Sequence, residues 1–215
     1  MARVRLTPAA ALPEVTGQVI KQGRLGTVSR IAPRRGEAGD VAPLVERDTR
    51  TARWGLRTVA RRLAAREARV LAVLSRIPDV PKLAGWDGRC LRRSWLDGIP
   101  LQAAKPLDRA YFREALRLVR RMHAFGIAHN DLAQASNWLV TAEGRPALVG
   151  FRHAVRVRYR GRRFRALAGA DLRDLLEHRR SHCAEALTPR QRAWVSRRRS
   201  WLERAWLRLV RPAAR

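Results

Sequence analysis

Residues 121–140, RMHAFGIAHNDLAQASNWLV, hold a group of polar side chains between two apolar segments. The group is His-x-Asp-Leu at 129–132, with Asn137 six residues after Asp131. A carboxylate can accept the proton of a hydroxyl nucleophile, and an amide oxygen on the same loop can bind a metal ion. Asp131 is therefore a candidate general base, and Asn137 is a candidate metal ligand.

The flanking sequence predicts strands first and helices later. Residues 15–31 alternate apolar and polar around Gly23 and Gly26, which predicts a hairpin with a glycine turn. Apolar residues at helical spacing predict helices over 52–77 and 108–125, the second ended by Gly126. Further strands are predicted within 41–48, 80–88, 90–98, 147–151 and 154–159, and further helices over 171–180 and from Thr188-Pro189 onward. This order favours an α+β fold with a small β-rich lobe and a mainly helical lobe.

The loop and its surroundings resemble protein-kinase-like phosphotransferases. They are most similar to short bacterial RIO-type and lipopolysaccharide-core-kinase-like proteins, which are described as serine/threonine kinases. The segments REARVLAVLSRI (66–77) and LRRSWLDGIPL (91–101) resemble the αC helix and the hinge strand of that family. The resemblance runs from Val19 to the last helix and implies an α+β, protein-kinase-like bilobal fold. The expected divisions are an N-terminal tail at 1–14, the N-lobe and hinge at 15–98, the C-lobe at 99–187, and a basic, tryptophan-rich helix at 188–215.

The same resemblance implies ATP and Mg²⁺ as cofactors. It places Gly23 and Gly26 in the phosphate-binding turn and makes Glu67 the αC glutamate. Two positions depart from the family pattern. The metal-binding aspartate is replaced by Gly150, and the strand lysine that pairs with the αC glutamate is replaced by Arg47. Glycine offers no side-chain ligand, and the planar arginine fork reaches differently from an ammonium group. The resemblance therefore implies a weakened or inactive phosphotransferase, a pseudokinase.

Three further interpretations concern the surroundings of this loop. Fixed positive charge on Arg47, Arg152 and His153 offers a substitute for the missing metal. Asp171 matches the family aspartate that braces the catalytic loop, although an ordinary aspartate at a helix N-terminus is an equal alternative. Only about twenty residues separate Phe151 from Asp171. That length resembles the small-molecule, glycan and RIO-type branches rather than regulated peptide kinases, which carry a long activation segment.

The charge of the chain points to anionic partners. The 215 residues include 46 Lys+Arg and 18 Asp+Glu, for a formal net charge of +28. Nearly all of the positive charge is arginine, a usage typical of GC-rich coding sequence, so a merely solvated basic surface is an even alternative to a dedicated anion site. The expected partners are a nucleotide and a phosphorylated glycan or protein acceptor. An anionic membrane surface is the alternative partner for the last helix, whose tryptophans otherwise pack on the helical lobe.

Other function classes are weaker. No nucleic-acid-binding motif is present, so only nonspecific nucleic-acid attraction is a rival, beside a non-catalytic scaffold at the inner membrane face. No run of about 18 apolar residues and no signal-peptide pattern occurs. Cys90 and Cys183 fit reduced thiols, so we expect a cytoplasmic protein, with peripheral attachment to the inner membrane as the alternative. We also expect three tryptophans (Trp54, Trp86, Trp95) in the core and two histidines (His178, His182) at the surface.

Overall fold

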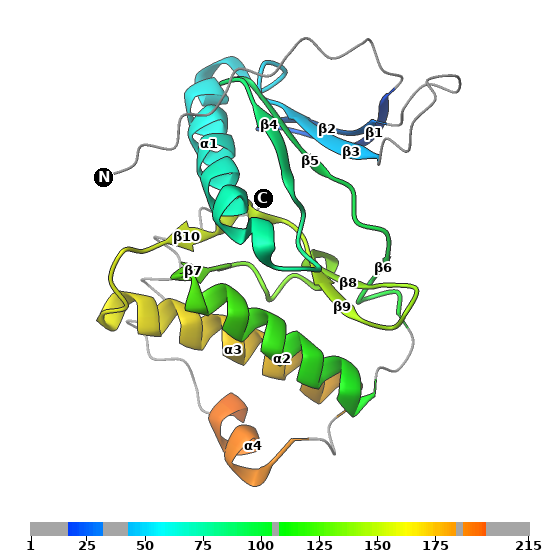
Figure 1. The fold of residues 1–215 in the computed structure, drawn as a ribbon, viewed down its shortest axis with the longest axis vertical. Coiled ribbons are helices and arrows are strands. Elements are labelled where there is room, and N and C mark those ends of the chain that lie inside the picture. The colour runs from blue at the N-terminus through cyan, green and yellow to red at the C-terminus, as the bar shows by residue number, and fades with distance from the viewer. Residues whose placement is uncertain (1–16, 32–42, 105–107, 184–186, 197–215) are drawn as a thin grey trace. The chain divides into compact units, whose positions relative to one another are not determined.

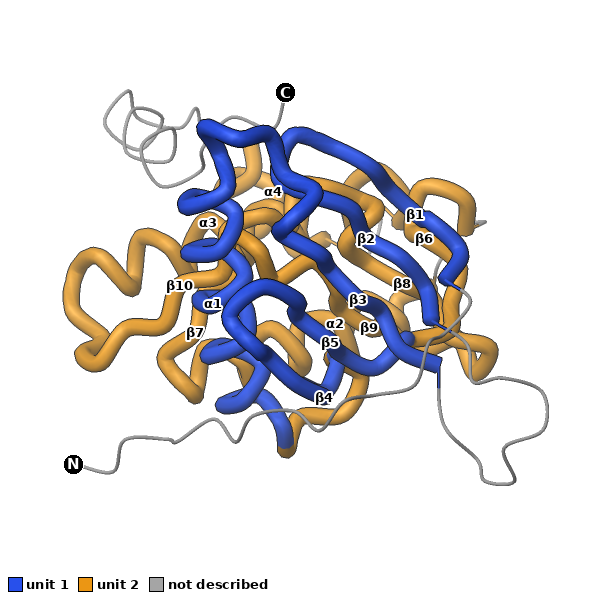
Figure 2. Tube along the Cα trace, turned by 90° about the horizontal axis from the view of Figure 1, so that it is seen from above, with its two compact units in different colours: residues 1–75, 81–95 blue, residues 76–80, 96–215 orange. Residues whose placement is uncertain are grey.

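The chain divides into two compact units. The computed structural model describes residues 17–31, 43–104, 108–183 and 187–196. Unit 1 comprises residues 1–75 and 81–95, and unit 2 comprises residues 76–80 and 96–215, shown in different colours in Figure 2. Unit 1 contains a sheet and one long helix, and unit 2 contains most of the helices with short strands (Figure 1). The predicted α+β class is confirmed.

A five-stranded antiparallel sheet forms unit 1. The strand order is β1-β2-β3-β5-β4, and every neighbouring pair runs antiparallel. The predicted hairpin with the glycine turn is confirmed by the pairing of β1 with β2. The strands are β1 (Gly17–Gly23), β2 (Gly26–Ile31), β3 (Leu44–Asp48), β4 (Leu83–Trp86) and β5 (Cys90–Ser94).

Helix α1 (Arg57–Val73) packs on this sheet through small side chains. It lies between two 3-10 turns, η1 (Trp54–Leu56) and η2 (Leu74–Arg76). The fully buried Ala64 and Ala68 contact Leu91 of β5, and the partly buried Leu83 and Trp86 pack against them. Alanines at a spacing of four residues form a flat stripe, which lets the helix approach the strands closely.

The expectation for the three tryptophans was right only in part. Trp86 packs against the core of unit 1, and Trp95 is partly buried beneath the guanidinium of Arg30, whose Cζ lies 4.6 Å from the ring centroid. Trp54 is 87% exposed, so its assignment to the core was wrong. It lies in η1, before the buried stripe of α1 begins.

Two long helices form the body of unit 2. Helix α2 (Arg109–Ala124) begins where predicted, because the Asp108 side chain accepts a hydrogen bond from Tyr111 N at 2.9 Å. Gly126 follows it with φ +70°, the left-handed conformation that commonly ends a helix. Helix α3 (Arg162–His182) begins nine residues before the predicted start at 171. Phe164 and Leu167, three residues apart, extend its buried face onto Ala128, and the surrounding arginines obscured this spacing in the sequence.

Short strands connect these helices. Strands β6 (Ile99–Pro100), β8 (Trp138–Val140) and β9 (Pro146–Leu148) form one sheet in the order β6-β8-β9. Strand β7 (Ile127–Ala128) pairs with β10 (Val155–Arg156). The strand predicted over 154–159 is therefore shorter than expected, because β7 offers only two residues for pairing. Two 3-10 turns complete this region, η3 (Ala135–Asn137) and η4 (Phe151–His153).

The last described helix is α4 (Pro189–Ser196), which begins where the sequence predicted. Thr188 Oγ1 accepts from Gln191 N at 3.2 Å, and Gln191 Oε1 accepts from Thr188 N at 3.0 Å, a reciprocal capping box. Val195 is buried, whereas Trp194 is 39% exposed. Residues 197–215, with the remaining tryptophans of the predicted stripe, lie outside the described residues. None of the helices in the described ranges is long and apolar enough to cross a membrane.

Candidate functional site

The loop between β7 and η3 brings the two predicted catalytic-loop residues together. Asp131 is half-buried, and the Asn137 side chain turns back toward it from η3. Asn137 Nδ2 donates to the Asp131 carbonyl oxygen at 2.8 Å and to Asp131 Oδ2 at 3.1 Å. The second carboxylate oxygen, Oδ1, has no hydrogen-bond partner in the part of the chain that the structure describes. The loop therefore presents one carboxylate oxygen that is still able to accept a proton.

The buried carboxylate of Asp171 fixes the backbone of this loop by hydrogen bonds. Asp171 lies in the middle of α3 and is fully buried. Its oxygens accept from His129 N at 2.8 Å and from Asn130 N at 2.9 Å, and His123 Nε2 lies 3.0 Å from Oδ2. Asn130 has φ +63°, an uncommon conformation for a residue other than glycine. Of the two alternatives for Asp171, the brace is correct, and the aspartate at a helix N-terminus is wrong.

Gly150 lies directly beside the side-chain amide of Asn137. Its φ is +81°, in the left-handed region. A Cβ atom added there would overlap Asn137 Oδ1 and approach Asn137 Cγ to 2.8 Å. The residue before Gly150 is bonded to Asn137 as well, because Val149 N donates to the Asn137 carbonyl oxygen at 2.9 Å. The amide of Asn137 therefore fills the space that the first atom of a metal-binding aspartate would need.

The residues after Gly150 secure this arrangement. The buried Phe151 ring lies 4.7 Å, between centroids, from the His129 imidazole, and His129 Nε2 lies 2.9 Å from the Val149 carbonyl oxygen. Arg152 Nε donates to His153 Nε2 at 3.0 Å. The three charges expected to substitute for metal remain a prediction.

The glycine turn of unit 1 has a structural requirement of its own. Gly26 is buried with φ +106°, and a Cβ atom there would overlap the carbonyl oxygen of Asp48. Gly23 is exposed, and a Cβ atom there would meet nothing within 4 Å. Gly26 is thus explained by the close approach of the turn to β3, whereas Gly23 leaves the outer side of the turn open.

Arg47 and Glu67 meet in unit 1, as expected for the residues that replace the family's lysine–glutamate pair. Arg47 Nη1 of β3 lies 3.5 Å from Glu67 Oε2 of α1, and the Glu67 side chain is fully buried. Arg93 of β5 lies on the other carboxylate oxygen, with Nε 3.5 Å from Oε1. The sequence analysis missed Arg93. The available signal was its alternation with the buried Leu91, since residues two apart on a strand share a face.

Neither cysteine is a candidate nucleophile. Both Cys90 and Cys183 are buried free thiols. Burial, helped by the nearby carboxylates of Asp48 and Glu46, raises the pKa of the Cys90 thiol to about 12. The reactive thiolate is therefore scarce at neutral pH, and thiol chemistry is not supported at this position.

The two histidines expected at the surface make specific contacts in unit 2. His178 Nε2 lies 2.8 Å from the Leu132 carbonyl oxygen, directly after Asp131 in the chain. The His182 ring lies 6.3 Å from the Phe112 ring. Their assignment as plain surface residues was wrong, because both lie on the face of α3 that packs against the rest of unit 2. Among the described residues, no group of three or more His, Cys, Asp or Glu side chains could hold a metal ion.

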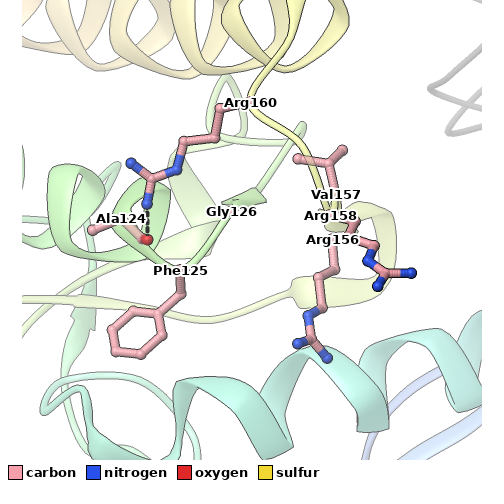
Figure 3. A pocket seen from close by; sticks show the side chains of 7 residues that line it. All are labelled: Ala124, Phe125, Gly126, Arg156, Val157, Arg158 and Arg160. Atoms are coloured by element: carbon pink, nitrogen blue, oxygen red, sulfur yellow. Dashed lines mark hydrogen bonds between the residues drawn. The ribbon is translucent and has the colours of Figure 1, made fainter. Parts of the chain in front are cut away.

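A basic cavity of about 530 Å³ lies at the end of α2 (Figure 3). The hydrogen bond from Val157 N to the Gly126 carbonyl oxygen, at 2.8 Å, joins its two walls. A Cβ atom at Gly126 would lie 2.7 Å from the Val157 carbonyl oxygen, so glycine is required there. Figure 3 shows the Arg160 guanidinium turned toward the Ala124 carbonyl oxygen, to which it donates a hydrogen bond. The lining residues are Ala124, Phe125, Gly126, Arg156, Val157, Arg158 and Arg160, with no acidic side chain among them.

Comparison with known proteins identifies the fold. No protein-family model matches the sequence, and no curated protein matches it. Among solved structures, the chain is similar to the Rio2 kinase from Chaetomium thermophilum, with a TM-score of 0.60 and 16% identity over 84% of this chain and 62% of that one. It is similar also to the ADP/Mg²⁺-phosphoaspartate complex of that kinase, with a TM-score of 0.60 and 15% identity over 94% of this chain and 63% of that one. The chain thus has a protein-kinase-like fold and spans less than two thirds of the length of these Rio2 chains.

Proposed function

We propose that this protein is a nucleotide-binding member of the serine/threonine or lipopolysaccharide kinase-like group in which phosphoryl transfer is weakened or lost. The observation that carries the proposal is Gly150. On a kinase-like fold, this position carries no carboxylate, and the amide of Asn137 occupies the space next to it. The loss concerns the step that needs charge neutralisation, whereas the residues expected to bind the nucleotide are largely retained.

Asp131 has the geometry of a general base in this proposal. Asn137 holds one carboxylate oxygen by a hydrogen bond, which orients the group, and the other oxygen is left to accept the proton of an acceptor hydroxyl. The Asp171 brace fixes the backbone of the same loop. ATP, when bound, supplies the phosphoryl group. The residues of this chain would position the acceptor and remove its proton.

The residues of the described chain do not fit Mg²⁺ as the fold family uses it. Hard divalent cations prefer carboxylate oxygens, and Asp131 is the nearest carboxylate in the loop. Its partner Asn137 is committed through Nδ2 to Asp131, and its Oδ1 faces Gly150. With no acidic group at position 150, the Asp131 carboxylate and the Asn137 amide are the ligands that remain in this loop, one carboxylate fewer than the fold family uses.

The nucleotide would be bound by residues of unit 1. The exposed Gly23 leaves the outer side of this turn open to the close approach of a phosphate group. Arg47, held by Glu67, takes the place of the family's phosphate-binding lysine. An arginine fork binds phosphate in a bidentate manner, so the replacement retains affinity while it changes the geometry.

The acceptor we propose is anionic, a phosphorylated glycan or protein. Only the segment from 154 to 161 lies between η4 and α3, which leaves no space for a long regulatory activation segment. The basic cavity beside β10 supports an acceptor that carries negative charge. We further propose a cytoplasmic location, with attachment to an anionic membrane surface through the basic C-terminal region as the alternative.

Thermal unfolding with ATP, with and without Mg²⁺, together with a phosphate-release assay, tests this proposal. We expect ATP to raise the Tm in both conditions, since a ligand at 100 times its Kd stabilises by about 2.7 kcal/mol. Phosphate release by the wild type should be slow or absent, and Asp131→Ala should remove whatever is seen. Rapid Mg²⁺-dependent turnover, about 1 s⁻¹ or more as in ordinary kinases, that Asp131→Ala abolishes would contradict the weakened catalysis. No shift with ATP would contradict nucleotide binding, and salt-sensitive binding to anionic vesicles would then favour the scaffold alternative.

A further inference from the structure

Three charged side chains are buried together in unit 1. Arg47 comes from β3, Glu67 from α1 and Arg93 from β5. The side chain of Glu67 is fully buried, and those of Arg47 and Arg93 are only 13% and 11% exposed. We call these three residues the arginine–glutamate cluster. Its members stand on three different elements, so the cluster belongs to the folded unit and not to a local turn.

The charges in this cluster do not balance. Two guanidinium groups face one carboxylate, and neither arginine has another ion-pair partner among the described residues. Each contact measures 3.5 Å, and neither Glu67 oxygen makes a hydrogen bond within the described chain. Burial lowers the pKa of Arg93; the charge of Arg47 acts in the same direction, and that of Glu67 opposes it. A buried, uncompensated positive charge is strongly unfavourable unless an anion joins it.

We propose that Arg93, together with Arg47, binds the phosphate groups of a nucleotide. This inference rests on the proposed nucleotide binding. It adds a phosphate-contacting residue, Arg93, and a consequence, which is that binding does not require Mg²⁺. The excess of one positive charge in the cluster is then a preformed site for a phosphate oxygen.

The strand register supports a phosphate as the ligand. Val28 of β2 is the direct partner of Arg47, and Gly26 precedes Val28 by two residues on the same strand. Arg47 therefore lies near the glycine-turn end of the sheet, whereas Arg93 pairs with Val45 farther along β3 and reaches Glu67 from there. Two arginine forks form a donor set suited to phosphate oxygens, since charge-assisted hydrogen bonds to phosphate are about twice as strong as neutral ones. Glu67 contacts one guanidinium group through each carboxylate oxygen, which fixes the positions of both arginines.

The test compares Arg93→Leu with Arg92→Leu. Arg92 is adjacent on β5, points to the opposite face and pairs with Glu46 at 2.7 Å, so its replacement controls for loss of an arginine from the strand. ATP and inorganic pyrophosphate are each titrated into the full chain in EDTA. We expect Arg93→Leu to weaken both ligands at least about tenfold, which is 1.4 kcal/mol. Arg92→Leu should change the affinity by less than about threefold.

A stability measurement shows whether a loss of affinity in Arg93→Leu comes from misfolding of the variant. Without ligand, Arg93→Leu should unfold at the same or a higher temperature than the wild type, because the variant removes an uncompensated buried charge. Equal ATP affinity of Arg93→Leu and wild type in EDTA would overturn the role of Arg93. Wild-type binding of ATP only with Mg²⁺ would overturn the inference and leave the proposed function standing. Absence of ATP binding in both conditions would overturn the proposed function itself.

Discussion

At the scale of single residues, the proposed loss of metal binding depends on the surroundings of Gly150. The family pattern places a carboxylate at this position, but here the backbone is left-handed and the Asn137 amide occupies the Cβ site. An aspartate at this position would therefore require the Asn137 side chain to move.

Restoring the aspartate should destabilise the protein. We expect Gly150→Asp to lower the free energy of unfolding by at most about 1 kcal/mol for the left-handed backbone, which aspartate tolerates better than most residues, with an additional penalty for displacing the Asn137 amide. Gly144→Asp is the matched control, because Gly144 has φ +72° and nothing within 4 Å of its Cβ site. Denaturant unfolding of both variants separates the two terms.

The difference between the two variants is the informative quantity. A larger loss for Gly150→Asp than for Gly144→Asp measures the steric conflict at the loop. Equal losses, or Mg²⁺-dependent phosphate release by Gly150→Asp, would show that the loop accepts a carboxylate at this position without difficulty.

At the scale of elements, the loop that carries Asp131 depends on α3. The Asp171 carboxylate satisfies two backbone N–H groups of the loop and contacts His123 of α2. We expect Asp171→Ala to destabilise unit 2 by on the order of 3 kcal/mol, because it leaves several buried donors unsatisfied. Asp131→Ala removes one half-exposed acceptor and should lower stability by about 1 kcal/mol or less.

Hydrogen exchange of the loop amides checks this dependence. In Asp171→Ala, the amides of His129 and Asn130 should exchange far faster than in the wild type, because their acceptor is gone. In Asp131→Ala they should remain protected. Unchanged protection in Asp171→Ala would contradict the brace.

The sequence predicted well the elements whose apolar residues repeat at a clear helical or strand spacing. The bounds of the other elements were predicted less well. Helix α2 was predicted almost to the residue, because its apolar stripe and its Asp108 cap are local signals. The early start of α3 was missed, because only Phe164 and Leu167 mark its first turns among many arginines. The exposure of Trp54 and the shortness of β10 depend on partners that are distant in sequence, which no local pattern records.

The same distinction applies to the site. Asp131 and Asn137 were found because they lie six residues apart on one loop. The arginine–glutamate cluster joins residues 47, 67 and 93, so the charge imbalance is visible only when three elements are packed together. The one local sign was that Arg93 lies two positions after the buried Leu91 on β5, so the two side chains share a face. The division of the chain at 98 and 187 remains a prediction.

At the scale of the whole molecule, the net charge of +28 attracts every anion. Exposed arginines act through solvent, and their attraction falls as salt shortens the Debye length to about 8 Å at 0.15 M ionic strength. The buried cluster is screened much less, so its contribution to ATP binding should persist at that salt concentration. Salt therefore distinguishes a specific nucleotide site from general attraction to a basic surface.

The most direct test of the account is calorimetric titration of ATP into the wild-type protein at about 0.15 M salt, first in EDTA and then with Mg²⁺. We expect saturable binding of one ATP per chain in EDTA. The Kd should lie within about threefold of the Kd measured with Mg²⁺, a difference of less than 1 kcal/mol. Binding that occurs only when Mg²⁺ is present would contradict the claim that arginine, and not metal, neutralises the phosphates in this protein.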